Sequence, residues 1–97
     1  MEIILLPEAE REIREAHAWY AERSHRVARV FVATLDERLE MLRRQPEACP
    51  IFVDAIRRCV LRRFPFGICY VVREGNIHLL ALAHHSRMPG YWRKRGL

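Results

Sequence analysis

The residues best suited to chemistry lie together near the end of the chain, in the run His-His-Ser-Arg-Met-Pro-Gly-Tyr-Trp. Its ionisable and aromatic members are His84, His85, Arg87, Tyr91 and Trp92. Imidazole titrates near neutral pH, so either histidine could serve as a general acid or base. The arginine could stabilise a crowded phosphate, and the tyrosine could assist. This set of side chains therefore permits RNA cleavage through attack by the 2′-hydroxyl group.

The same segment is also suited to binding without catalysis. One histidine could pack at the end of a sheet while the other forms hydrogen bonds at the surface. Arg87, Tyr91 and Trp92 could contact a protein, since these residue types are enriched at hot spots, and the two rings could stack on bases. Adjacent side chains of a strand point to opposite faces, so His84 and His85 cannot readily share a metal ion. We favour binding and expect neither a metal nor a cofactor.

Four more arginines precede this segment and could extend its surface: Arg57, Arg58, Arg62 and Arg63. They could track phosphates, dock a protein or form a solvated strand face, and we favour docking. The charge of the chain is divided in the same sense. Residues 1–56 carry 8 Lys/Arg and 11 Asp/Glu, a net −3, and residues 57–97 carry 9 Lys/Arg and one Glu, a net +8. This asymmetry indicates an anionic partner, either nucleic acid or an acidic protein segment.

Length and composition limit the class of protein. The 97 residues suffice for one small domain, residues 1–97. With 51% hydrophobic residues and no apolar run near the roughly 18 residues of a membrane span, we expect a globular chain outside the membrane. No basic region precedes the first apolar run, so we predict a cytoplasmic protein without a secretory signal. The cysteines are odd in number and lack C-x-x-C spacing, which favours buried thiols at Cys49, Cys59 and Cys69.

Hydrophobic spacing predicts the elements that must position these side chains. Residues 2–6 form an apolar strand, and residues 8–23 then have the spacing of an amphipathic helix. Ser24 is suited to cap a second helix, which should stop near Gln45 because Pro46 disfavours helical geometry before it. With so few residues between them, the two helices must form an antiparallel hairpin.

The second half of the chain changes to strand spacing, after a loop at residues 47–54. The predicted strands are residues 56–64, 66–73 and 77–83. Pro65 blocks a ladder hydrogen bond, so Phe64-Pro65-Phe66 marks a strand edge with both rings in the core. The order β-α-α-β-β-β predicts an α+β fold, in which the N-terminal helical hairpin packs on one face of a small antiparallel sheet. The other face of that sheet should look outward.

This combination of elements and motifs resembles one family. A strand, an α-hairpin, an Arg-bearing strand, Phe-Pro-Phe-x-Ile-x-Tyr and a strand ending in His-x-x-Arg-x-Pro-x-Tyr-Trp are similar to the RelE/ParE superfamily of type II toxin–antitoxin toxins. The resemblance covers nearly the whole chain and is most specific between Arg57 and Trp92. It implies a small α+β toxin, neutralised when a co-expressed antitoxin wraps its acidic segment around the helices and sheet in a hetero-oligomer.

The superfamily has two branches with different targets. RelE-like members cut messenger RNA within the ribosome, and ParE-like members poison DNA gyrase. The long helical hairpin and the Phe-Pro-Phe strand resemble the ParE-like branch more closely. The ribonuclease branch commonly has an arginine just after the aromatic residue that is Phe66 here. This chain has Gly67 in that position, which removes one expected phosphate ligand.

We therefore interpret the chain as a ParE-like toxin that binds and inhibits an essential target, with DNA gyrase as the first candidate. No residue is then catalytic, and the side chains expected to contact the target or the antitoxin are Arg57, Arg58, Arg62, Arg63, Arg87, Tyr91 and Trp92. The alternative is a ribosome-dependent endoribonuclease that cleaves mRNA with His84, His85, Arg87 and Tyr91. A third interpretation is a non-toxic binding module with the same fold.

Overall fold

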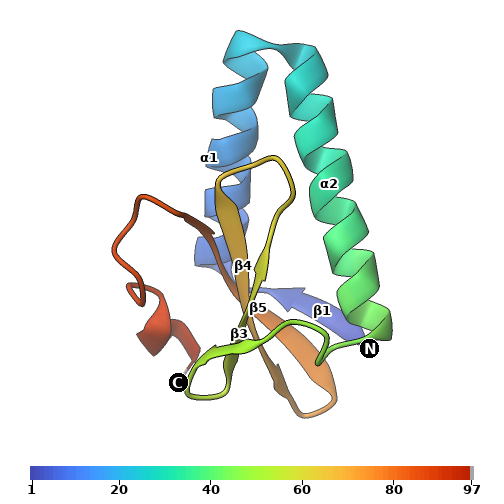
Figure 1. Ribbon diagram of the computed structural model, residues 1–97, viewed down its shortest axis with the longest axis vertical. Coiled ribbons are helices and arrows are strands. Elements are labelled where there is room, and N and C mark those ends of the chain that lie inside the picture. The colour runs from blue at the N-terminus through green and yellow to red at the C-terminus, as the bar shows by residue number, and fades with distance from the viewer. Residues whose placement is uncertain (97) are drawn as a thin grey trace.

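The chain forms two helices and a five-stranded sheet (Figure 1). The computed structural model describes residues 1–96. In chain order the elements are β1 (Glu2–Leu5), α1 (Pro7–Arg23), α2 (His25–Arg44), β2 (Ile51–Val53), β3 (Ile56–Val60), β4 (Phe66–Arg73), β5 (Asn76–His84) and the 3-10 helix η1 (Arg93–Gly96). The predicted α+β class and its helical hairpin are confirmed. Among residues 1–96, the helices lack an apolar stretch of the length that a membrane span requires.

The hairpin follows from local sequence signals. Pro7 occupies the first turn of α1, where its missing N–H is not needed. Ser24 is the one residue between the helices, and its hydroxyl accepts a hydrogen bond from the Val27 N–H at 3.2 Å, which caps α2. The second helix ends at Arg44, two residues before Pro46, as the sequence predicts.

The sheet is mixed rather than wholly antiparallel. Its strand order is β1-β5-β4-β3-β2, and β1 runs parallel to β5 while the other neighbours are antiparallel. The strand that the sequence did not predict is β2. It lies within the segment predicted as a loop, residues 47–54. β2 has only three residues, and its register with β3 is irregular. A strand of three residues is too short to show an alternating hydrophobic pattern in the sequence.

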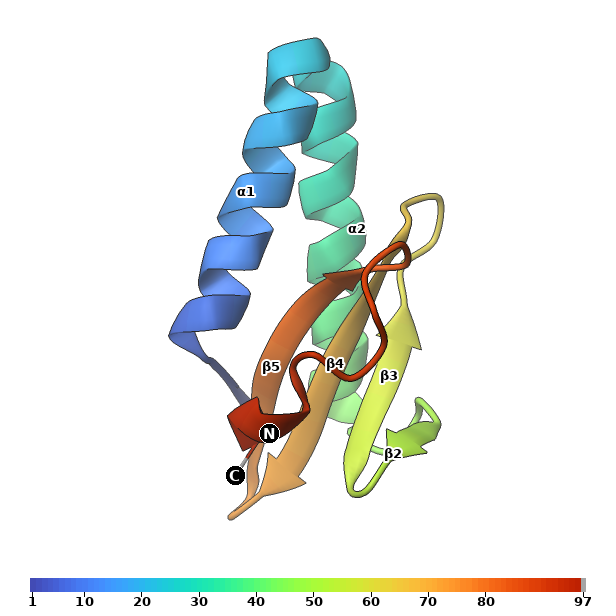
Figure 2. The same cartoon turned by 90° about the vertical axis from the view of Figure 1, so that its left-hand side faces the viewer.

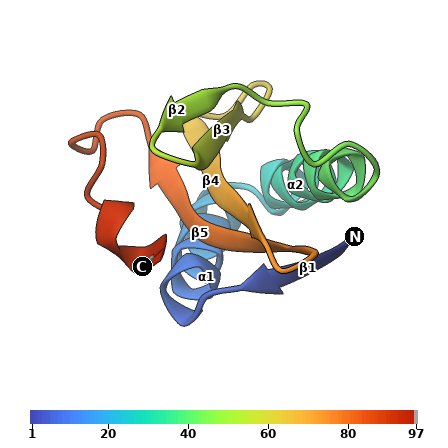
Figure 3. The same ribbon diagram turned by 90° about the horizontal axis from the view of Figure 1, so that it is seen from below.

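Both faces of the sheet are covered. The helices pack on one face, where Phe31 of α2 is fully buried and its ring centroid lies 5.3 Å from that of Phe64. On the other face, the segment after β5 lies across the sheet (Figures 2 and 3). Trp92 packs there in a second cluster with the buried residues Ile56, Cys69, Val71, Leu80, Ala81 and Ala83. The prediction that this face looks outward is therefore wrong over the area that Trp92 covers.

A bulge in β5 prepares the edge at which the candidate site lies. Tyr70 pairs with Leu79 and Cys69 with Ala81, so Leu80 is an extra residue between the two pairs. The bulge lets Leu80 and Ala81 both pack in the second cluster. The N–H and C=O groups of successive strand residues point to alternate edges of the strand. The extra residue at the bulge therefore changes which residues of β5 direct these groups away from β4.

Candidate functional site

Along the outer edge of the second half of β5, side chains form the hydrogen bonds that a neighbouring strand would otherwise form. Within the described residues, β1 pairs with β5 only as far as Leu79. Beyond it, Glu12 Oε1 on α1 accepts hydrogen bonds from the Leu82 N–H at 3.2 Å and from Arg95 Nη1 at 2.9 Å. Arg95 Nη1 also donates to the Leu80 carbonyl at 3.1 Å. This largely buried ion pair satisfies the strand edge and fastens the end of the chain to α1.

Tyr91 completes this arrangement. Its hydroxyl donates to Glu12 Oε2 at 2.8 Å, and the guanidinium carbon of Arg87 lies 4.0 Å from the centre of its ring. Burial is the main cause that raises the pKa of Tyr91, to about 12, and the hydrogen bond to the Glu12 carboxylate adds to it. The phenol is therefore protonated at neutral pH and acts as a donor that holds the C-terminal segment.

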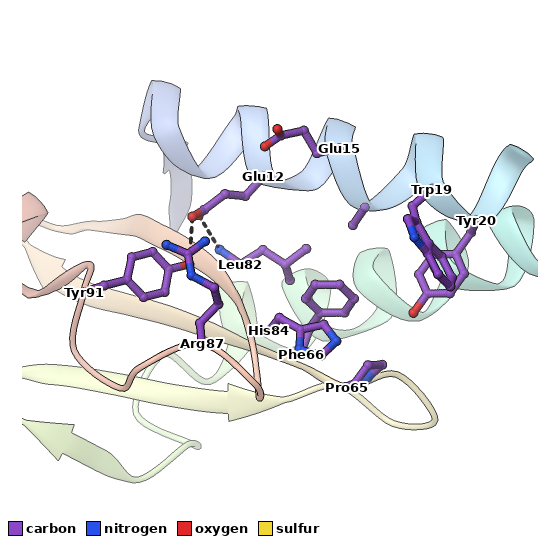
Figure 4. A pocket seen from close by; sticks show the side chains of 11 residues that line it. Glu12, Glu15, Trp19, Tyr20, Pro65, Phe66, Leu82, His84, Arg87 and Tyr91 are labelled. Atoms are coloured by element: carbon purple, nitrogen blue, oxygen red, sulfur yellow. Dashed lines mark hydrogen bonds between the residues drawn. The ribbon is translucent and has the colours of Figure 1, made fainter.

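A cleft of about 400 Å³ lies between α1, the end of β5 and this segment (Figure 4). Phe66 and Leu82 contribute to its apolar lining, and the aromatic rings of Trp19 and Tyr20 lie at one end. Trp19 is 53% exposed although it is one of the largest apolar side chains in the protein. The polar side chains at the other end include Glu12 and Arg87. An apolar cleft with charged groups at its rim is suited to bind an amphipathic segment.

The two histidines do not form an acid–base pair. His84 lines the cleft, and its Nδ1 accepts a hydrogen bond from the Ser86 N–H at 3.0 Å, with the Ser86 hydroxyl 2.7 Å away. Because Nδ1 is the acceptor, the neutral ring carries its hydrogen on Nε2 and has no free lone pair with which to act as a base. His85 does not line this cleft. It is exposed, and its backbone N–H donates to the Pro65 carbonyl at 2.8 Å.

The arginines expected to act together are separated by the structure. Arg57 donates to the Cys49 carbonyl at 2.8 Å and pairs with Glu47. Arg58 follows it in β3, and its side chain therefore lies on the opposite face. Arg62 and Arg63 are exposed in the connection between β3 and β4. These four side chains do not form one stripe.

The basic half of the chain is also less uniform than its net charge indicates. Three of its basic residues pair with acidic residues of the first half: Arg57 with Glu47, Arg93 with Asp54, and Arg95 with Glu12. The Arg93 pair has two hydrogen bonds, of 2.8 and 3.1 Å, and they lower the pKa of Asp54. The expected continuous cationic surface is thus reduced to the arginines that have no such partner.

Trp92, expected to contact a partner, is only 2% exposed. Its ring lies in the second core cluster, 5.8 Å from the ring of Phe52. A buried indole cannot present its face to a partner, so Trp92 is better understood as the anchor that holds residues 85–96 on the sheet. We therefore omit Trp92 from the proposed contact surface and keep Arg87 and Tyr91, which line the cleft.

Glu12, Trp19 and Tyr20 are site residues that sequence reasoning missed. Glu12 is an acidic residue in the first half of α1. It lies three residues after Ala9 and four before Ala16, both buried, so it belongs to the buried side of α1. An acidic residue within a predicted apolar stripe is the signal that could have identified it.

The three cysteines have no place in this site. Cys49, Cys59 and Cys69 are free and buried, as expected from the sequence. Burial raises the pKa of both Cys59 and Cys69 to about 12, which keeps the thiols protonated and unreactive at neutral pH. Within residues 1–96, no cluster of His, Cys, Asp and Glu could hold a metal ion.

The fold and cleft together define a class: small α+β proteins with a cleft between a helical hairpin and the end of a five-stranded sheet. The family model described as the ParE toxin of the type II toxin–antitoxin system, parDE, matches residues 3–89. Since that match spans most of the sequence, the chain belongs to the ParE toxin family.

Comparison with solved structures supports the fold. A structure of the chromosomal ParDE toxin–antitoxin system from P. aeruginosa is similar, with a TM-score of 0.75 and 19% sequence identity. The similarity covers 87% of this chain and 95% of that one. At this identity the likeness establishes the architecture alone. The comparison with curated proteins gives no match.

Proposed function

We propose that this ParE-family toxin arrests growth by binding and inhibiting DNA gyrase, and that a cognate antitoxin with an acidic segment neutralises it. The observation that carries the proposal is the cleft beside Trp19, together with the family match over residues 3–89. A toxin that acts by binding needs an accessible apolar anchor with charged neighbours, and this cleft supplies both. The expected compartment is the cytoplasm, where gyrase and the antitoxin are found.

The geometry favours binding over mRNA cleavage. Cleavage requires a base within reach of the 2′-hydroxyl, an acid for the leaving oxygen and a cation on the phosphate. In its neutral form His84 uses its one acceptor nitrogen on Ser86, and the Tyr91 hydroxyl donates its hydrogen bond to the Glu12 carboxylate. His85 is the one remaining candidate of the expected set, and no fixed acid is placed with it among the described residues.

The antitoxin is proposed to occupy the cleft as an amphipathic segment. Its apolar side chains would lie on Phe66 and Leu82, with the indole of Trp19 as the exposed end of the same surface. Arg23 stacks over Trp19 at 3.7 Å from the ring centre and offers a positive charge beside it. This pairing of an aromatic ring with a cation suits a segment in which Asp or Glu alternates with apolar residues.

A Trp19→Ser variant tests the antitoxin half of this proposal. Binding of the antitoxin encoded beside the gene should weaken by at least about tenfold, because an exposed tryptophan at an interface commonly contributes 2 kcal/mol or more, roughly a thirtyfold change in affinity. The measurement is titration calorimetry with the purified pair. Val32→Ser is the control, since Val32 is an exposed apolar residue of α2 (40% exposed) outside the cleft, and it should change affinity less than about twofold. Equal losses in both variants would contradict the proposal.

A further inference from the structure

The side chain of Arg58 lies against Gly67 of β4. A Cβ atom built on Gly67 would lie 2.7 Å from Arg58 Nε and 3.3 Å from its Cγ, so Arg58 would have to shift if residue 67 had a side chain. Gly67 has no positive φ, so its backbone would accept any residue. The glycine is therefore needed for the space that it leaves to Arg58. The sequence suggested that Gly67 removes a cation from this surface, and the structure shows that it makes room for one.

The guanidinium of Arg58 is not fully satisfied within residues 1–96. Its Nε is buried and has no hydrogen bond, and no carboxylate of residues 1–96 forms an ion pair with Arg58. Its guanidinium carbon lies 5.2 Å from the centre of the Phe52 ring. A buried donor without an acceptor costs free energy, and the cost is larger for a charged group. Nε itself is covered, so an acceptor from outside the chain would meet this guanidinium where Arg58 lines a cleft.

A small cleft of about 30 Å³ lies at this arginine, on the face of the sheet away from the helices. Its polar lining includes Arg58, His85 and Arg87, and Phe52 and Met88 are among its apolar walls. No Asp or Glu lines it, in contrast to the larger cleft, which contains Glu12 and Glu15. The volume suits a water-sized polar group and excludes an aromatic base.

We propose that this cleft receives the carboxylate of an Asp or Glu side chain from the antitoxin, with Arg58 as its principal partner. The inference rests on the proposed function. A carboxylate is small, planar and anionic, so it fits the volume, and it supplies the acceptor that Arg58 lacks. His84, Arg87 and Tyr91 line both clefts. A segment whose apolar residues occupy the first cleft can therefore pass over these residues and place an acidic side chain in the second.

The test compares Arg58→Met with Arg73→Met in the full-length protein. Both changes remove one positive charge, and Arg73 is exposed at the far end of β4. The probes are a fluorescein-labelled peptide of alternating Glu and Leu, the same peptide with Gln in place of Glu, and a single-stranded RNA oligonucleotide. Arg58→Met should weaken the Glu peptide by about tenfold or more, and Arg73→Met by less than about twofold. Affinity for the Gln peptide should not change in either variant.

Gly67→Ala provides a second variant without any change of charge. The new Cβ must displace Arg58, so the Glu peptide should bind several-fold more weakly while the chain keeps its net charge. Urea unfolding shows whether each variant is folded, and Arg58→Met should be at least as stable as the parent because it removes an unsatisfied donor. A loss of both stability and binding in Arg58→Met would assign a structural role to the arginine and overturn the inference.

Two further outcomes would overturn it. Equal weakening by Arg58→Met and Arg73→Met would mean that only net charge attracts the acidic peptide. Tighter binding of RNA than of the Glu peptide, lost in Arg58→Met, would make this a nucleic-acid site. Failure of the inference is distinguishable from failure of the proposed function. An antitoxin that still binds through Trp19 but ignores Arg58 removes the carboxylate site alone, whereas an antitoxin that does not bind the parent protein removes both.

Discussion

Replacement of Trp92 by alanine is expected to destabilise the protein by about 3–5 kcal/mol, the usual cost of deleting a buried aromatic side chain. The ring is 2% exposed and fills the centre of the cluster that covers the second face of the sheet. Such a loss corresponds to a fall in Tm of more than about 12 °C for a chain of this size. Urea unfolding followed by circular dichroism measures it.

Met88→Ala is the matched control for that measurement. Met88 lies in the same segment, and it is 79% exposed. Its replacement should change the free energy of unfolding by less than about 0.5 kcal/mol, as is usual for surface substitutions. If the two variants lost the same stability, Trp92 would not be the anchor of the C-terminal segment, and its ring would again be available to a partner.

The second large effect is expected at Glu12. A Glu12→Ala variant should lose about 3 kcal/mol, because one carboxylate serves the Leu82 N–H, the Tyr91 hydroxyl and Arg95. Its side chain is 12% exposed and that of Arg95 is 16% exposed, so the solvent screens the pair weakly. Glu15→Ala, one turn away and exposed, is the control and should cost less than about 0.5 kcal/mol.

A double-mutant cycle isolates the ion pair from other effects of the Glu12 change. Arg95→Met removes the charge while keeping most of the apolar stem. The double variant Glu12→Ala/Arg95→Met should be more stable than the sum of the single losses indicates, with a coupling energy above about 1 kcal/mol. Purely additive losses would show that Glu12 does not hold the end of the chain through Arg95.

The local elements of this fold could be predicted, but their neighbours in the sheet could not. Helical spacing, the cap at Ser24 and Pro46 placed both helices within a few residues of their observed ends. Spacing reports which face of an element is buried and carries no information on which strand lies beside it. Hydrophobic spacing therefore could not predict the parallel pairing of β1 with β5 or the three-residue strand β2.

The sequence predicted which segment of the chain is of interest, and it did not predict how the side chains of that segment pair and pack. Residues 84–92 are the segment that the sequence singles out, and Arg87 and Tyr91 of that segment line the cleft. The net charge of a segment does not show which charges pair in space, so the three ion pairs to the acidic half were not predicted. Trp92 was predicted to be a docking residue, because the polar and basic residues around it indicated an exposed segment. That ring is buried against residues of β3, β4 and β5 that are distant from it in the sequence, such as Ile56, Val71 and Leu80.

Inhibition of gyrase by binding of this toxin is tested by measuring plasmid supercoiling and message integrity after induced expression. We predict growth arrest with inhibited supercoiling and intact messages, both unchanged in a His85→Ala variant. The purified protein should inhibit supercoiling by gyrase in the same way. Messages that are cleaved, with cleavage lost in His85→Ala and supercoiling unaffected, would contradict the account and establish an endoribonuclease instead.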